Sequence, residues 1–346
     1  MKEKPLLSIC IPTYNRDKFL DETIESVISQ ITKDIKEKVE LCISDNASTD
    51  DTDKVIEKWK VKSPIRIVYN KNNENLGADR NYLKVIEIAS GEYCWFLGSD
   101  DKIAPTAIKM VLDLIADFKY DILITNRLEC DLKMNPIRNQ SFFKKPNLTW
   151  NIYDAKMLKK YFDNVNFLAG VFAYISSIIL RKKIWVVDSN IEKFIGTAYV
   201  HVYVLLGSLI RGATIKHVNK PLVFTRLGND SFASEGFIRR LLLDFEGYSK
   251  IADYYFKDNK ELYDSFLKIL KRNHSFRRLI TIQHYSAMKY FYDYLKLCGW
   301  SELHIKLSYY FRWVYRFKRI YKLFVFIFNN SATCFSKYIT KIIQFK

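Results

Sequence analysis

Apolar residues in the first third of the chain follow two patterns that alternate along the sequence. Uninterrupted apolar runs of four to eight residues are typical of strands covered on both faces, whereas apolar residues at intervals of three or four share one face of a helix. Their alternation predicts an α/β protein with a doubly wound, mostly parallel sheet. The predicted strands are LLSICI, VELCISD, IRIVYN, YCWFLGSDD and DILITN, which begin at residues 6, 39, 65, 93 and 121.

Helices are predicted in the segments between these strands. Asp50 and Asp51 precede the second helix, where acidic residues favour a helix start. Pro105 opens the last of them, at an early helical position that proline tolerates. The predicted helices cover residues 19–31, 55–59, 83–88 and 108–115.

The last third of the chain is predicted to be helical. Residues 126–170 have no clear period and are expected to form loops over the sheet, and residues 176–185 and 213–226 are predicted later strands. From residue 237 apolar side chains recur every three or four positions. We therefore predict a sheet domain, residues 1–230, and a C-terminal helical appendage, residues 231–346.

The end of the chain is both basic and aromatic. Residues 305–346 contain Lys, Arg, Tyr, Phe and Trp, and no acidic residue follows Glu302. Such a segment is expected to lie in the plane of an anionic membrane surface, with aromatic rings at the level of the headgroups. The alternative is a terminal helix whose apolar side packs on the rest of the protein.

Charge and cysteine content narrow the class of protein. The formal net charge of +17 favours a polyanionic partner, which could be a nucleic acid, an anionic membrane or a phosphorylated substrate. No nucleic-acid-binding motif accompanies it, so no nucleic acid is expected. The six cysteines form no CxxC pair, and no apolar run reaches the ~20 residues that span a bilayer. We expect a cytoplasmic protein, peripheral on the inner face of the plasma membrane.

Polar side chains follow three of the predicted strands where each strand ends. The segment PTYNR, Asp45 and the pair Asp100–Asp101 occupy these positions. Ligands of open α/β sheets bind at the carboxyl ends of the strands. No glycine-rich phosphate loop is present, so a cation is the expected way to hold a diphosphate. Carboxylates are ligands that Mg²⁺ and Mn²⁺ prefer. The alternative is that the acidic pair only caps a turn.

Several motifs in the same order resemble the family 2 glycosyltransferases of the GT-A fold. The resemblance is strong over residues 5–120 and weaker to about residue 225. GSDD and the helical end are similar to the subgroup that builds bacterial surface polysaccharides, including abequosyltransferase-like enzymes. The motifs are SICIPTYNR, FLDETIESVISQ, ISDNASTDDT and NENLGADRNYLKVIEIASGEYCWFLGSDD.

The resemblance implies roles for residues on the nucleotide side. Pro12, Thr13 and Tyr14 would form the loop against the base and ribose, and Asp45 would accept a hydrogen bond from the base. The alternative for Asp45 is a turn closed by its own side chain.

It also implies roles near the phosphates. Asn75, Gly77 and Arg80 match the family stretch near the diphosphate, with ADRN where AARN is common. Asp100 would contact the ribose or a metal-bound water, and Asp101 would be the direct ligand of Mn²⁺ or Mg²⁺.

The chain departs from the family at the expected base. Val200 and His201 stand where the family has a Glu-Asp pair, in VHVYVLLGSLIRG. An imidazole can accept a proton near neutral pH, so His201 is the candidate base, although it could instead be structural. Asp188 and Glu192 are reserve candidates. Arg226 lies where related enzymes place a mobile loop that closes on the diphosphate.

These observations predict an inverting, metal-dependent glycosyltransferase. The expected donor is a nucleoside-diphosphate sugar, with a UDP-sugar as first choice, and the expected acceptor is a lipid-linked glycan. Two alternatives stay open at this point. One is a basic nucleic-acid-binding protein, and the other is a non-catalytic scaffold that binds sugar nucleotides.

Overall fold

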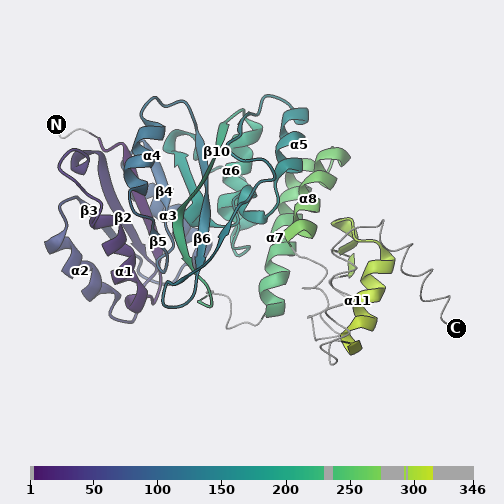
Figure 1. Ribbon diagram of the computed structural model, residues 1–346, viewed down its shortest axis with the longest axis horizontal. Helices are drawn as coiled ribbons and strands as arrows, with labels where there is room; N and C mark the ends of the chain where they lie inside the picture. The colour runs from purple at the N-terminus through teal and green to yellow at the C-terminus, as the bar shows by residue number, and fades with distance from the viewer. Residues whose placement is uncertain (1–3, 230–236, 274–291, 294, 315–346) are drawn as a thin grey trace.

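A computed structural model of the protein describes residues 4–229, 237–273, 292–293 and 295–314. Its centre is one sheet in the order β3-β2-β1-β4-β9-β6-β10-β5. The strands β3, β2, β1 and β4 are parallel to one another, and β10 is parallel to β6. The predicted α/β class with a mostly parallel sheet is therefore confirmed (Figure 1).

The strands of this sheet agree with the runs predicted from the sequence, with additions in the second half. The segment predicted as loops contains β7, which pairs with β6, and β8, which pairs with β10. A further difference is β9, which lies antiparallel between β4 and β6. The strands are β1 (Leu7–Thr13), β2 (Val39–Asp45), β3 (Ile67–Lys71), β4 (Tyr93–Phe96), β5 (Lys102–Ile103), β6 (Ile122–Cys130), β7 (Pro136–Gln140), β8 (Thr149–Asn151), β9 (Ile178–Arg181) and β10 (Thr214–Arg226).

Helices cover both faces of the sheet because alternate residues of the buried strands face opposite sides. On β1, Leu7 and Ile9 belong to a cluster with residues of α1, α2 and α4, whereas Cys10 belongs to a second cluster with α3, α5 and α6. Each fully buried Leu or Ile contributes about 1.5–3 kcal/mol. The helices are α1 (Asp17–Ile28), α2 (Thr52–Lys62), α3 (Gly77–Ile88), α4 (Ala107–Ile115), α5 (Ala155–Asn164) and α6 (Val200–Ile210).

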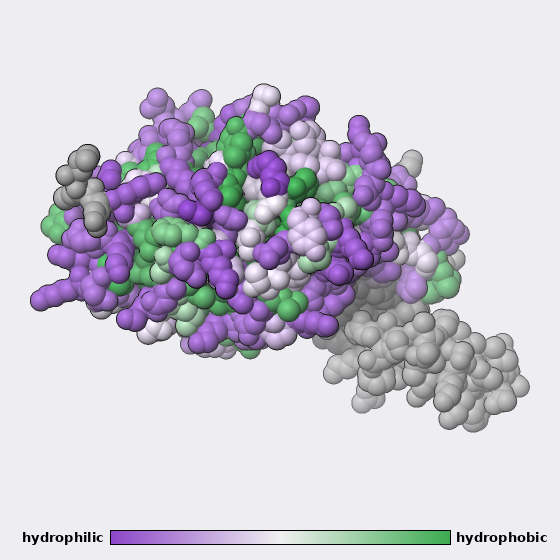
Figure 2. All heavy atoms as spheres, turned by 90° about the horizontal axis from the view of Figure 1, so that it is seen from above, coloured by the Kyte–Doolittle hydropathy of each residue, from purple (hydrophilic) through white to green (hydrophobic). Residues whose placement is uncertain are grey.

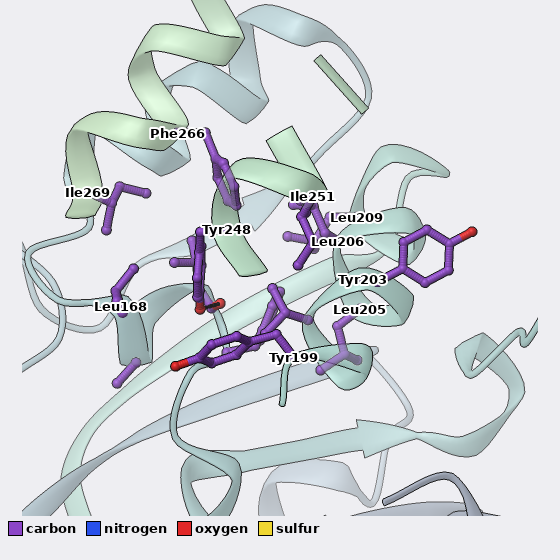
Figure 3. Packing of buried hydrophobic residues seen from close by; sticks show 14 of the residues in the cluster. Leu168, Tyr199, Tyr203, Leu205, Leu206, Leu209, Tyr248, Ile251, Phe266 and Ile269 are labelled. Atoms are coloured by element: carbon purple, nitrogen blue, oxygen red, sulfur yellow. Dashed lines mark hydrogen bonds between the residues drawn. The ribbon is translucent and has the colours of Figure 1, made fainter. Parts of the chain in front are cut away.

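The C-terminal helices α7 (Phe237–Phe256) and α8 (Lys260–Asn273) pack into the second cluster. Figure 3 shows Tyr248 and Phe266 of these helices beside side chains of α6. Two glycines permit the close approach: a Cβ on Gly247 would lie 2.5 Å from the ring of Tyr199, and one on Gly207 would lie 2.5 Å from the Tyr255 hydroxyl. The predicted boundary near residue 230 falls outside the described residues and stays a prediction, while α7 and α8 share a core with the sheet domain.

The last described helix, α11 (Glu302–Val314), contains the start of the basic aromatic segment. Ile305 of this helix and Trp300 just before it are buried in the same cluster as residues of α8. The prediction for residues 315–346 lies outside the described residues. Within the part of the chain that is described, no helix combines the length and apolar character needed to cross a bilayer. On the face shown in Figure 2, hydrophobic side chains form separate patches between hydrophilic ones.

Candidate active site

The predicted site residues on the first three strand ends do meet at one edge of the sheet. Thr13 and Asp45 are register partners at the ends of β1 and β2. Leu97, which follows β4, donates its backbone N–H to the carbonyl of Cys10 in β1 at 2.9 Å, so the acidic pair begins just beyond the same edge. This edge is where open α/β sheets bind ligands.

The loop after β1 presents one aromatic side chain to solvent. Tyr14 is 42% exposed, whereas Pro12 and Thr13 are buried. The next residue, Asn15, has a φ of 50° and receives the N–H of Thr49 on its side-chain oxygen at 2.8 Å. The loop after β1 is thus tied to the loop after β2, and the Tyr14 ring is available for contact with a planar group.

Asp45 is fully buried and its carboxylate serves the loop that follows it. One oxygen accepts the backbone N–H of Ser48 at 2.9 Å, and the other accepts the hydroxyl of Tyr69 at 3.0 Å. This is the side-chain-closed turn that the sequence left open as the alternative. The implied contact of Asp45 with a base stays a prediction.

Asn46, which sequence reasoning did not select, joins this loop to the start of α3. Its amide group donates to the side-chain oxygen of Asn75 at 2.6 Å and accepts the N–H of Leu76 at 2.9 Å. Gly77 follows with a φ of 81°, a conformation that residues with a Cβ rarely adopt. Asn75 and Gly77 therefore shape the turn before α3, beside the strand ends.

Two further polar residues of α3, also missed, are buried against the site. Asn81 donates to the carbonyl of Ser44 at 3.0 Å and accepts the hydroxyl of Ser44 at 2.7 Å. Asp79 accepts the N–H groups of Ala198 and Val200 at 2.9 and 3.1 Å, which places the N-terminus of α6 beside α3. Burial raises the pKa of Asp79. The signal for it was the ADRN stretch, where the family commonly has AARN.

Arg80 faces the same side of the site and is held by an ion pair. Its guanidinium donates to both carboxylate oxygens of Glu192, at 3.2 and 2.7 Å. The side chains are 42% and 61% exposed, so the pair is open to solvent and easily exchanged for another anion. The contact brings the reserve candidate Glu192 next to the residue implied near the diphosphate.

Asp101 is the buried member of the acidic pair and is 4% exposed. Its Oδ2 accepts the hydroxyls of Tyr174 and Ser176, both at 2.6 Å, and its Oδ1 accepts the N–H of Arg226 at 3.3 Å. Burial, with the charge of Asp100 next to it, raises the pKa of Asp101 to about 7. The surroundings of Asp101 therefore disfavour its ionised form.

Arg226 lies against the pair without neutralising its carboxylates. Its guanidinium donates to the carbonyl of Asp100 at 3.2 Å and to the carboxylate of Glu22 at 3.1 Å. The Asp100 carboxylate instead accepts the side-chain amide of Asn229 at 2.7 Å, and Arg16 donates to the carbonyl of Asn229 at 3.3 Å. The end of β10 is thus joined to the loops after β1 and β4. The closure of the Arg226 loop on a diphosphate stays a prediction.

The two carboxylates of the acidic pair could supply part of the coordination shell of a divalent cation. A Cβ on Gly98 would lie 2.9 Å from Asp101 Oδ2 and 3.4 Å from Asp100 Oδ1, so both carboxylates converge on a space that only glycine leaves open. Carboxylate oxygens suit Mg²⁺ and Mn²⁺. Among the described residues no group of three or more acidic, His or Cys side chains forms a complete site, so further ligands would have to come from substrate or water.

His201 does not present the nitrogen that the predicted base role requires. The ring is 1% exposed, and its Nε2 donates to the carbonyl of Phe172 at 2.9 Å. Its Nδ1 is buried and has no hydrogen-bond partner among the described residues. Burial lowers the pKa of His201 to about 4. The reserve candidate Asp188 is also engaged, since both its oxygens accept the hydroxyl of Tyr203 at 2.9 Å.

Comparison with known proteins agrees with the fold and the motifs. The model of glycosyl transferase family 2 matches residues 8–183. The chain is 37% identical to the abequosyltransferase RfbV of Salmonella typhimurium over 276 residues, which are 77% of this chain and 80% of that protein. It is 35% identical over 109 residues to the GalNAc(5)-diNAcBac-PP-undecaprenol β-1,3-glucosyltransferase of Campylobacter jejuni, covering 31% of this chain and 34% of that one.

The solved structure of TarS from S. aureus in complex with UDP covers 85% of this chain and 81% of its own, with 18% identity and a TM-score of 0.58. That likeness confirms the predicted GT-A fold. The predicted enzyme class, a nucleotide-sugar-dependent glycosyltransferase of bacterial polysaccharide synthesis, is likewise supported by the family model and the curated relatives. The chain therefore belongs to family 2 of the glycosyl transferases.

Proposed function

We propose that this glycosyltransferase moves a sugar from a nucleoside-diphosphate donor to a hydroxyl of a lipid-linked glycan, with inversion at the anomeric carbon. The observation that carries the proposal is the meeting of Thr13, Asp45 and the Asp100–Asp101 pair at one sheet edge. Inversion requires a single displacement, in which the acceptor oxygen attacks as the diphosphate leaves on the opposite side.

The donor is held by two groups of residues in this proposal. Tyr14, which is exposed, covers the base, and Asp45 accepts a hydrogen bond from it. Arg80 leaves Glu192 and pairs with the diphosphate, because a diphosphate offers more negative charge than one exposed carboxylate. A thermal-shift screen of UDP-, GDP-, CDP- and dTDP-sugars identifies the base, since a ligand of the folded state raises the melting temperature. We expect a UDP-sugar to give the largest shift.

Asp100 and Asp101 would hold Mn²⁺ or Mg²⁺ at the space beside Gly98. When bound there, the cation would offset negative charge on the leaving diphosphate. The acidic pair itself orients this end of the donor, and Arg226 keeps the loop after β10 against it. Calorimetry should show tighter donor binding with Mn²⁺ than with EDTA, and equal affinities would contradict this part of the proposal.

The acceptor hydroxyl must lose a proton as its oxygen attacks, and Glu192 meets the access requirement better than His201. Its carboxylate is exposed and is released when Arg80 turns to the diphosphate, whereas the free nitrogen of His201 is enclosed by protein. General-base help contributes about 10²–10⁴ in rate. The turnover number of Glu192→Gln should be lower than that of the unaltered protein by a factor within that range. Glu87→Gln serves as the control, because Glu87 lies near the C-terminal end of α3, away from Arg80. If turnover falls in His201→Gln and not in Glu192→Gln, the base is the histidine.

A lipid-linked acceptor is supported by the undecaprenol-linked glycan in the name of the Campylobacter relative and by the basic residues after Glu302. This proposal places the protein peripherally on the inner face of the plasma membrane. Deleting residues 315–346 should move the protein from the membrane fraction to the soluble fraction. Unchanged partition would remove the membrane contact from the proposal without affecting the chemistry.

One other function is favoured by a specific observation. A non-catalytic sugar-nucleotide scaffold would fit the lack of the Glu-Asp pair at Val200–His201 and the enclosed imidazole. Transfer or donor hydrolysis by the purified protein distinguishes the two. The nucleic-acid-binding alternative is not needed to explain a chain of this family.

A further inference from the structure

Tyr174, a residue outside every motif of the chain, reaches the acidic pair from a distant part of the sequence. It lies between two short 3₁₀ segments, η2 (Leu168–Val171) and η3 (Ile175–Ser177). Its hydroxyl donates to Asp101 Oδ2 at 2.6 Å and is paired with the hydroxyl of Thr225 on β10. The guanidinium of Arg127 on β6 lies over its ring, 4.6 Å from the centroid. Tyr174 is therefore held by contacts with Asp101 on one side and with residues of β6 and β10 on the other.

The backbone before Tyr174 has a conformation that needs support. Phe172 is buried and has a φ of 72°, in the left-handed region that a bulky side chain rarely adopts. Its carbonyl accepts Nε2–H of His201 at 2.9 Å, and the carbonyl of Val171 accepts the hydroxyl of Tyr248 at 2.8 Å. Helices α6 and α7 thus hold this segment in a strained form, and such strain persists where surrounding structure fixes it, often at functional sites.

These contacts define how Asp101 is oriented. Oδ2 of Asp101 is the oxygen nearest the space beside Gly98, and it is the same oxygen that receives the hydroxyls of Tyr174 and Ser176. Ser176 in turn accepts the N–H of Gly98 at 2.8 Å. Without the Tyr174 hydroxyl, one of the two donors that fix this oxygen is lost while the bulk of the ring remains.

We propose that Tyr174 is a positioning residue that orients Asp101 toward a divalent cation, and that His201 acts through Phe172 to hold Tyr174 in place. This inference rests on the proposed function for its cation and donor. It also gives His201 a role that agrees with its enclosed ring, because the imidazole works as a hydrogen-bond donor to the backbone and not as a base.

The experiment compares Tyr174→Phe with the unaltered protein by calorimetric titration of Mn²⁺ alone and of UDP in the presence of Mn²⁺. A hydrogen bond to a charged group is worth enough for about a tenfold or larger loss of Mn²⁺ affinity. Tyr93→Phe is the matched control, since it removes a buried hydroxyl, bonded to the carbonyl of Tyr120 at 2.7 Å, from the other end of β4. It should leave Mn²⁺ binding unchanged.

Two more substitutions test whether a loss of Mn²⁺ affinity in Tyr174→Phe is due to misfolding. Ser176→Ala removes the second donor to the same oxygen and should weaken Mn²⁺ binding in the same direction as Tyr174→Phe. His201→Gln, whose amide can still donate to the Phe172 carbonyl, should keep more Mn²⁺ affinity than His201→Leu. A merely structural role would lower the melting temperature of these variants without changing Mn²⁺ affinity.

The outcomes separate this inference from the proposed function. Mn²⁺ affinity equal to that of the unaltered protein in both Tyr174→Phe and Ser176→Ala overturns the inference. If the unaltered protein transfers sugar but binds no Mn²⁺, the inference fails and the transferase function stands. If its Mn²⁺ affinity depends on the Tyr174 hydroxyl but it neither binds nor transfers any sugar nucleotide, the positioning role stands and the proposed function fails.

Discussion

The two sides of the candidate site are built in different ways. On the nucleotide side, the loops are joined by hydrogen bonds between residues of the first quarter of the chain, such as Asn15 with Thr49, 34 positions apart, and Asn46 with Asn75, 29 positions apart. On the acidic side, Asp101 is held by Tyr174, Ser176 and Arg226, which come from much later in the chain. The first side can be recognised as motifs, whereas the second exists only after folding.

This difference has a consequence for stability as well as for function. On the nucleotide side, the buried Asp45 carboxylate is satisfied within its own loop, by the N–H of Ser48. The acidic side keeps a buried carboxylate whose pKa is raised to about 7 by burial and by its neighbour Asp100. A raised pKa in a folded protein means that the charged form is unfavourable there, so the acidic side is stabilised when a cation or proton is bound.

The largest expected effect follows from breaking the acidic side at Asp101→Asn. A bound cation supplies several kcal/mol of charge stabilisation, so kcat/KM should fall by about 10³-fold, and Mn²⁺ affinity should fall with it. Steady-state kinetics over a range of Mn²⁺ concentrations measures both. Asp53→Asn, an exposed carboxylate paired with Lys71 at the same sheet edge, serves as control and should retain activity.

Acidification should remove the stability that buried, neutral His201 contributes, while protonation of Asp101 acts in the opposite direction because its pKa is raised. Burial lowers the pKa of His201 to about 4, against an unfolded value of about 6.5. The unfolded chain therefore binds the proton first, and the stability due to neutral His201 is complete above pH ~6.5 and is lost as the pH falls toward 4. Within that window one proton changes the free energy of unfolding by about 1.4 kcal/mol per pH unit.

Urea denaturation at several pH values from 8 to 4 measures this dependence. His201→Gln should show a smaller slope of the free energy of unfolding against pH than the unaltered protein. His217, also buried with its pKa lowered to about 4, continues to contribute in both. Identical slopes in the two proteins would mean that His201 is not buried in its neutral form.

Asn46→Ala tests the nucleotide side alone. The substitution removes the side-chain acceptor of the Leu76 N–H and the donor to Asn75, and each lost hydrogen bond costs about 0.5–1.5 kcal/mol. The loop before α3 should loosen, so the donor KM should rise while kcat and Mn²⁺ affinity change little. A fall in kcat without a change in KM would show that the two sides are not separable.

The smallest effect is expected for Gly77→Ala. An alanine at a φ of 81° costs about 1–2 kcal/mol, although the structure leaves open space for its methyl group. Gly196→Ala is a matched control, because Gly196 has a φ of 85° and equally open surroundings. Both variants should lose similar stability by thermal denaturation, but only Gly77→Ala should weaken donor binding. Equal donor affinities of Gly77→Ala and Gly196→Ala would mean that the turn before α3 is not part of the donor site.

Much of the framework could be predicted from the sequence because its signals are local. The buried strands β1, β2 and β4 are apolar runs, and their ends place Thr13, Asp45 and the acidic pair where parallel strands must meet. The expectation of loops over residues 126–170 is wrong at α5, β7 and β8. The two short strands gain their stability from pairing with β6 and β10 and carry no period of their own.

The sequence alone determined the α/β class, the family and the strand-end residues, because periodicity and contiguous motifs need no knowledge of distant contacts. Only the tertiary structure decided which side chains surround the acidic pair and what His201 faces. The contacts of Asp101 with Tyr174 and of His201 with Phe172 join segments that no local pattern relates. Burial and hydrogen bonding then set the charge and access of each group, and both quantities are properties of the packed chain.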